Sequence, residues 1–127
     1  IYPIIDLNWQ GLVYQTGTGV QVVESEPPLQ NFNVNWRPGV EKIIIVFSDE
    51  DPQSYMDPVL ELDDVKSALG TTSQLKLYTF SRSGSDKQKW EQLSDAGGGE
   101  WFLLSNNPTT MYNSLMKILD EICKDEN

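Results

Sequence analysis

The densest group of oxygen-bearing side chains in the sequence is the run from Ser48 to Asp51, a serine followed by three acidic residues. Hydroxyl and carboxylate oxygens are the ligands that hard cations such as Mg²⁺ or Ca²⁺ prefer. Asp49 lies two residues beyond the end of a strongly apolar stretch, so we expect it to be the main metal ligand, with Ser48 beside it. Glu50 and Asp51 are candidates for contact with a bound ligand. Clusters of this composition are also ordinary turn residues, and that structural role is the alternative.

A second polar loop runs from Ser81 to Asp86, with the sequence SRSGSD. A loop of this kind ahead of a helix can hold an anion through hydroxyl groups and backbone N–H groups. Ser81 and Ser83 are therefore candidate ligand-binding residues. The alternative is a solvated loop that ends in a helix N-cap.

Composition narrows the chemistry of any site. The 127 residues include no histidine, which excludes Ser-His and Cys-His nucleophile pairs as well as histidine metal ligands. The 19 acidic and 9 basic side chains give a net charge of -10, which repels phosphate backbones and anionic lipid. We expect no nucleic-acid partner. We also expect no membrane insertion, because no stretch approaches the roughly 20 apolar residues that a transmembrane helix needs.

Three apolar stretches are predicted to be strands that position these loops. Lys42 to Phe47, KIIIVF, is apolar on both faces, which is typical of a central strand in a covered parallel sheet. Two more strands are expected over residues 75–80 and 100–104. Parallel strands place their carboxyl ends at one edge of the sheet, where ligands usually bind. The two polar loops are therefore expected to meet at that edge.

Helical patterns lie between and after these strands. One helix is predicted to begin at Asp57-Pro58 and to end at Gly70. A second is expected to begin near Asp86, to bury Trp90 and Leu93, and to end at the glycines of residues 97–99.

The last helix is predicted to open at Asn107-Pro108. Its buried face is expected to hold four apolar residues at helical spacing, namely Met111, Leu115, Leu119 and Ile122. Cys123, the single cysteine, is expected to be an inert thiol on the buried side of this helix.

The alternation of strands and helices predicts an α/β fold, a three-layer, doubly wound and mostly parallel sheet. Residues 9–15 and 20–24, joined by a short glycine-containing link, are expected to form an antiparallel hairpin at the edge of that sheet. The length suits a single domain over residues 1–127. Because the sequence begins at Ile1, we expect it to be part of a longer protein.

The segment KIIIVFSDEDPQS, residues 42–54, resembles the fourth strand and following loop of von Willebrand factor A (VWA) domains. The later order, with strand LKLYTFS, a helix, GGEWFLL and a closing amphipathic helix, is similar to that family as well. The resemblance implies a doubly wound α/β fold and a Mg²⁺-dependent adhesion site that binds a protein ligand. It implies that Asp49 and Ser48 contribute to that metal site, and that the protein is secreted or displayed at the cell surface.

The sequence departs from the VWA pattern at the first strand, which normally ends in Asp-x-Ser-x-Ser. The nearest match is the string that begins at Asp6, DLNWQ, so Asp6 is the candidate third metal ligand. We expect the place of the first strand to be filled by residues 1–7, by a partner chain such as a complementary N-terminal piece of the same protein, or by direct pairing of the hairpin with the strand at residues 42–47.

The leading interpretation is a protein-binding, adhesion-type module that performs no catalysis. One alternative is a degenerate, metal-free interaction domain. Another is a receiver-like phosphoacceptor domain, with Asp49 as the acceptor and Thr79 or Ser81 as the partner hydroxyl. A Mg²⁺-dependent phosphohydrolase built on Asp49-Glu50-Asp51 ranks last, because the threonine and lysine that it needs are missing from suitable places.

Overall fold

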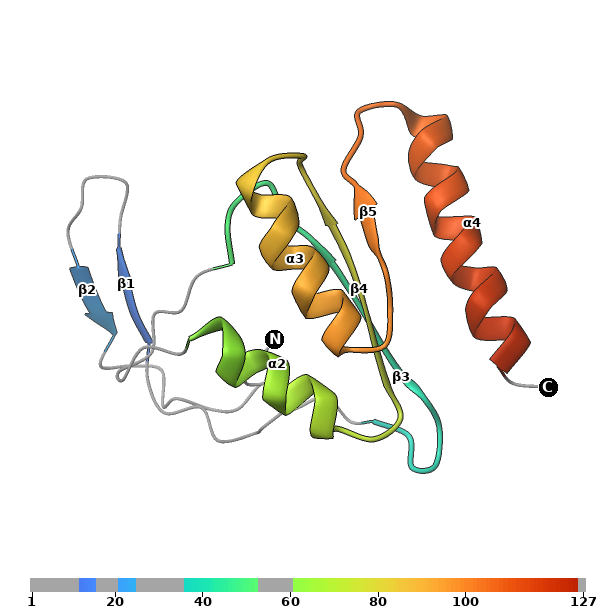
Figure 1. Cartoon of the computed structure of the whole chain (residues 1–127), viewed down its shortest axis with the longest axis horizontal. Coiled ribbons are helices and arrows are strands. Elements are labelled where there is room, and N and C mark those ends of the chain that lie inside the picture. The colour runs from blue at the N-terminus through green and yellow to red at the C-terminus, as the bar shows by residue number, and fades with distance from the viewer. Residues whose placement is uncertain (1–11, 16–20, 25–35, 53–60, 126–127) are drawn as a thin grey trace.

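The computed structural model describes residues 12–15, 21–24, 36–52 and 61–125 (Figure 1). Asp6, Trp9, Asp57 and Pro58 lie outside these residues. In chain order the elements are β1 (Leu12–Gln15), β2 (Gln21–Glu24), β3 (Lys42–Phe47), α2 (Leu62–Thr71), β4 (Leu75–Ser81), α3 (Ser85–Ala96), β5 (Trp101–Leu103) and α4 (Pro108–Asp125). From β3 onward strands and helices alternate, which confirms the predicted α/β class.

The three later strands form one parallel sheet in the order β3-β4-β5. Lys42 is in register with Leu75 on β4, and Phe80 on β4 is in register with Phe102 on β5. The prediction that KIIIVF is the central strand is wrong for the described residues, because β3 lies at the edge and β4 at the centre. Leu77 to Ser81 of β4 are buried throughout, since β4 is the one described strand with a neighbour on each side and helices over both faces.

The predicted hairpin is present as an antiparallel pair. Leu12 of β1 is in register with Glu24 of β2, and Gln15 with Gln21. In the described backbone this pair is a separate two-stranded sheet, so the expected pairing with the parallel sheet is absent there.

Two apolar clusters fix the helices to opposite faces of the sheet. On one face, Leu77 packs with Leu69 of α2 and with Trp90 and Leu93 of α3. On the other face, Tyr78, Phe80 and Phe102 pack against Ile118 of α4. Figure 1 shows this arrangement, with α2 and α3 on one side of the strands and α4 on the other.

The helix boundaries follow local signals. α2 begins at Leu62, four residues after the predicted start, where the Asp64 carboxylate accepts a hydrogen bond from the Glu61 N–H at 2.9 Å. α3 buries Trp90 and Leu93 and ends at Ala96, directly before the predicted stop at Gly97. Gly99 is required there because a Cβ atom would lie 1.9 Å from the carbonyl oxygen of Leu77.

α4 begins at Pro108 as predicted, but its buried face is turned from the predicted one. Ile118 is the most buried residue of the helix, and Met111, Leu115 and Ile122 pack beside it. Leu119 is 51% exposed and Cys123 is exposed as well, so both predictions of burial are wrong. The reason is the 3.6-residue period, which continues the Met111–Leu115 row to residue 118 and not to residue 119. Among the described helices, none has the length and apolar character needed to cross a bilayer.

Candidate functional site

The carboxyl ends of β3 and β4 bring the two predicted loops together, as the parallel topology requires. The loop after β3 folds on itself, since the Ser48 hydroxyl donates to the Glu50 carbonyl at 3.0 Å and accepts from the Glu50 N–H at 3.1 Å. The buried Trp90 indole of α3 donates to the same Glu50 carbonyl at 2.9 Å. These bonds fix the loop after β3 onto α3. We call residues 48–51 and 81–86 together the polar rim.

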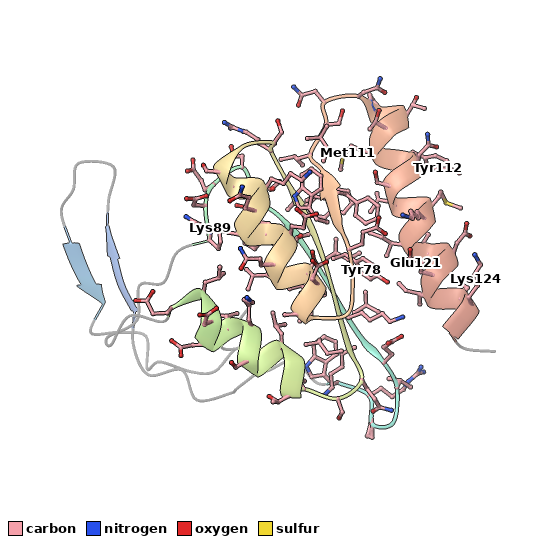
Figure 2. All side chains as sticks on the ribbon, viewed as in Figure 1. Tyr78, Lys89, Met111, Tyr112, Glu121 and Lys124 are labelled. Atoms are coloured by element: carbon pink, nitrogen blue, oxygen red, sulfur yellow. The ribbon has the colours of Figure 1, made fainter. Side chains whose placement is uncertain are left out.

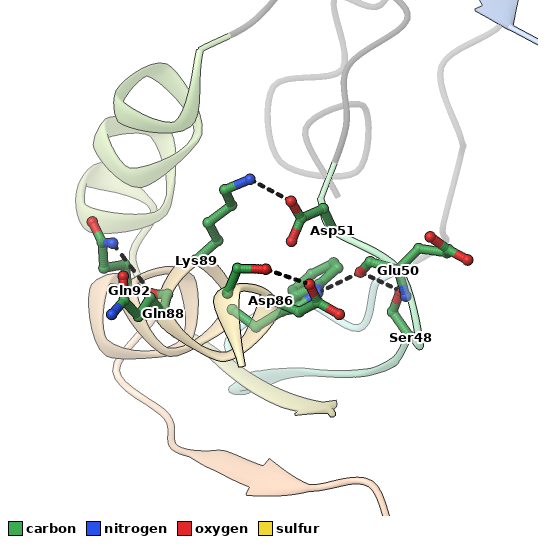
Figure 3. A network of polar contacts seen from close by, with 9 residues as sticks. Ser48, Glu50, Asp51, Asp86, Gln88, Lys89 and Gln92 are labelled. Carbon is green, nitrogen blue, oxygen red and sulfur yellow. Dashed lines mark hydrogen bonds and ion pairs between the residues drawn. The ribbon is translucent and has the colours of Figure 1, made fainter. Parts of the chain in front are cut away.

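Two of the three predicted acidic residues of the polar rim are each paired with a cationic side chain, Asp49 with Arg82 and Asp51 with Lys89. Arg82 donates to the Asp49 carboxylate at 2.9 Å, with both side chains more than half exposed. Lys89 of α3 donates to the Asp51 carboxylate (Figure 3). The two carboxylates are thereby partly neutralised by the chain itself.

Asp51 of the polar rim has a pKa below its ordinary value. The hydrogen bond from Lys89 lowers the pKa of Asp51, while partial burial opposes the shift. Its Oδ1 atom is buried and has no hydrogen-bond partner among the described residues. Figure 3 shows Lys89 directed at Asp51 with Asp86 close by. The arrangement stabilises the ionised form of Asp51.

The hydroxyl groups at the end of β4 are buried and form hydrogen bonds within the protein. Ser81 is fully buried, and its hydroxyl accepts a hydrogen bond from the Trp101 indole at 2.8 Å and donates to the Arg82 carbonyl. Thr79 is also fully buried and donates to the Trp90 carbonyl at 3.0 Å. Ser83, in contrast, is exposed on the loop.

The remaining predicted ligands are only partly brought together. The Glu50 side chain is exposed at the polar rim, and Asp6 falls outside the described residues. Within those residues, no three carboxylate or cysteine side chains converge as a metal-binding group.

A second feature was not predicted, and it lies on the α4 face of the sheet. Phe47 stacks on Phe80 at 4.6 Å between ring centroids, and Phe80 stacks on Phe102 at 5.2 Å. This aromatic row is buried under α4 at Phe80 and Phe102, but Phe47 at the β3 end is 52% exposed. Ile45, two residues earlier on the same face of β3, is 38% exposed.

One side of α4 carries further exposed apolar side chains. Tyr112, Met116 and Leu119 are exposed and form a row turned about 100° from the residues that pack on the sheet. Figure 2 shows Met111 between α4 and the sheet, with Tyr112 on another side of the helix.

The direction in which this row faces follows from Lys117, on the opposite side of α4. Its ammonium group lies over the Phe102 ring and bonds Glu100 at 2.7 Å, so that side faces β5. The row of Tyr112, Met116 and Leu119 therefore faces β3.

Together these residues define what we call the β3–α4 surface, made of Ile45, Phe47, Tyr112, Met116 and Leu119. They are five of the six large hydrophobic side chains exposed among the described residues; the sixth, Leu103, belongs to β5. Leu103 alternates with Phe102, so it lies on the opposite face of the sheet. Exposed apolar side chains that gather in one place mark interaction sites, whereas scattered ones do not.

Tyr78, on the central strand β4, links the sheet to the helix α4 that covers it. Its hydroxyl donates to the Glu121 carboxylate of α4 at 3.3 Å (Figure 2). Burial, reinforced by the negative charge of Glu121, raises the pKa of Tyr78 to about 12. α4 thus seals the centre of the sheet but leaves the β3 side open.

The chain matches no protein-family profile, no curated protein sequence and no solved structure. Function is therefore inferred from the geometry of the molecule.

Proposed function

We propose that this chain is a non-catalytic protein-binding module, and that a protein partner docks on the β3–α4 surface. The observation that carries the proposal is the exposure of Ile45 and Phe47 on β3 and of Tyr112, Met116 and Leu119 on the side of α4 that faces β3. Aromatic residues and methionine are enriched in the centres of protein interfaces. Phe47 and Tyr112 provide large rings that lose little conformational entropy on binding.

The polar rim supplies the border of this interface. Asp49 and Glu50 follow Phe47 after one intervening residue, Ser48, so carboxylates lie at the end of the apolar area. Interfaces commonly have a polar rim around an apolar centre. The chain also carries a net charge of -10, which favours a partner with basic residues at this border.

We propose the metal-free form of this module as the better supported one. Arg82 and Lys89 already partly neutralise Asp49 and Asp51, which reduces the attraction of the polar rim for a divalent cation. The Mg²⁺- or Ca²⁺-dependent, VWA-like form, with Asp49, Ser48 and Asp6 as ligands, predicts that millimolar Mg²⁺ raises the Tm of the chain. We expect no rise, and a rise that Asp49→Asn abolishes would favour the metal-dependent form.

The β3–α4 surface can be tested by photocrosslinking in cells that make the protein. A benzophenone amino acid replaces Phe47 in one variant and the control residue Leu103 in another. We expect crosslinks to another polypeptide from position 47 and few from position 103. The crosslinked protein, once purified, should bind the wild-type chain at least ten times more tightly than the Phe47→Ser variant. Crosslinks from position 47 that join only residues of the same chain would contradict the proposal.

A further inference from the structure

The outer edge of β3 presents a row of backbone groups. In the parallel pairing of β3 with β4, the Lys42 N–H donates a hydrogen bond to the Gln74 carbonyl at 2.6 Å. The Ser48 N–H donates one to the Phe80 carbonyl at 3.0 Å. Along a strand, the backbone N–H and C=O groups of successive residues point to opposite sides. The backbone groups of the even-numbered residues of β3 therefore form hydrogen bonds with β4, and those of the odd-numbered residues point away from β4. The N–H and C=O groups of Ile43, Ile45 and Phe47 therefore point outward, and the described residues supply no partner for them.

The side chains of β3 do nothing to block this edge. Sheets usually protect an outer strand by charged residues, proline, a bulge or short length. β3 is six residues long, regular in its pairing, and apolar except for Lys42 at its start. Ile45 and Phe47, which carry outward backbone groups, are also the exposed members of the β3–α4 surface.

We propose that β3 receives an extended segment of the protein partner as an additional strand of the sheet. Main-chain hydrogen bonds from Ile43, Ile45 and Phe47 hold the added strand, and its alternate apolar side chains lie beside Phe47 and the exposed row of α4. This inference rests on the proposed function and specifies the mode of binding at the same surface.

Charge identifies the class of segment. Carboxylates stand at both ends of β3, with Glu41 before it and Glu50 after it, and Glu50 is exposed at the polar rim. A segment with alternating apolar and basic residues matches this pattern. A second copy of this chain fits poorly, because each copy carries a charge of -10 and the two would repel.

The first test uses an eight-residue synthetic peptide of alternating valine and lysine, added to the full chain. Two matched controls carry methyl groups on the backbone nitrogens of the valines or of the lysines. Residues of one type share one edge of a strand, so the strand mode predicts that one methylated peptide binds at least ten times more weakly than the other. Equal binding of the two methylated peptides would overturn strand addition.

Amide hydrogen exchange gives an independent result. In the chain alone we expect slow exchange at Ile44, Val46 and Ser48, and fast exchange at Ile43, Ile45 and Phe47. The peptide should slow exchange at Ile45 and Phe47. Slow exchange at those amides before the peptide is added would show that the edge is already paired, by the chain itself or by a second copy, and would overturn the inference.

A variant of the edge completes the test. Ile45→Pro removes one outward N–H and keeps the bonds of β3 to β4, a change that outer strands tolerate. We expect the Tm to change little and peptide binding to weaken at least tenfold. If Ile45→Pro binds normally while crosslinking at position 47 persists, the strand mode fails and the protein-binding function stands.

Discussion

The two outer strands of the parallel sheet are built in different ways. β5 is only three residues long, and a lysine ammonium group lies over an aromatic ring on each of its faces. Lys87 lies over Trp101, and Lys117 lies over Phe102. β3 is twice as long, its outward backbone groups have no partner among the described residues, and Phe47 at its end is half exposed. Short strands and lysines discourage pairing, and a long apolar edge invites it. The contrast indicates that one edge is closed and the other is open to association.

The largest effect that tests this contrast is expected along the aromatic row. Phe80→Ala removes a fully buried ring from the covered centre of the sheet, and we expect a loss of about 3–5 kcal/mol in the free energy of unfolding. Phe47→Ala should cost well under half as much, because half of that side chain is already in water. Urea denaturation of the two variants measures the difference. Similar losses would mean that Phe47 is covered in solution, and the contrast between the edges would disappear.

A smaller loss of stability is expected from a substitution at Gly99, in the segment between α3 and β5 that lies against β4. Gly99→Ala places a methyl group against the Leu77 backbone, and we expect it to cost about 1–3 kcal/mol through overpacking. Gly70→Ala, in α2, is the control, because a Cβ atom there meets nothing within 4 Å. That substitution should be neutral or stabilise the chain by up to about 1 kcal/mol. Thermal denaturation of both variants measures the two effects. A loss of stability in Gly99→Ala but not in Gly70→Ala would show that the chain packs tightly against β4 on the β5 side.

Alkaline pH should reveal how firmly α4 covers the centre of the sheet. The pKa of Tyr78 is raised from 10.0 to about 12 in the folded chain, so its stabilising contribution is complete below pH 10 and declines as the pH rises toward 12. Tyr78→Phe cannot ionise and should lose less stability over that range than the wild type. Phenolate absorbance, compared between the two proteins, should assign a transition near pH 12 to Tyr78. A transition near 10 would indicate that α4 opens readily.

The smallest effect is expected at the polar rim. The pKa of Asp51 is lowered in the folded chain, so the Asp51–Lys89 pair contributes stability above the ordinary value of 3.8 and loses it as the pH falls below that value. Asp51→Asn should therefore show a weaker decline in Tm on acidification than the wild type. Asp120→Asn, on the exposed side of α4, serves as the control. Parallel acid profiles for wild type and Asp51→Asn would show that the pair contributes nothing measurable.

Much of the fold was predictable because β4, α3 and α4 combine clear local signals. The glycines of residues 97–99 ended α3 as expected, and Pro108 opened α4. The position of β3 was mispredicted because an apolar run that is buried on both faces looks the same as one that leaves Ile45 and Phe47 exposed. Periodicity alone also misplaced Leu119, because the buried row of α4 was read one residue too far along the chain.

The candidate site was predictable in place but not in its contacts. Parallel topology brought Asp49 and Asp51 to the same edge as the loop after β4, as expected. Their cationic partners, Arg82 and Lys89, lie 33 and 38 residues away in the sequence, a distance over which pairing leaves no local pattern. The β3–α4 surface was missed because it joins two elements at opposite ends of the alternating region, and each looks like core by itself.

The indole bond between Trp90 and the Glu50 carbonyl has an optical consequence. Trp90 is almost entirely shielded from water, yet it is tied to the loop that immediately follows the open strand. A displacement of that loop during association breaks or bends this bond and alters the emission of the buried ring. The chain therefore carries its own fluorescent reporter of events at β3, and Trp90→Phe is the variant in which that signal should vanish.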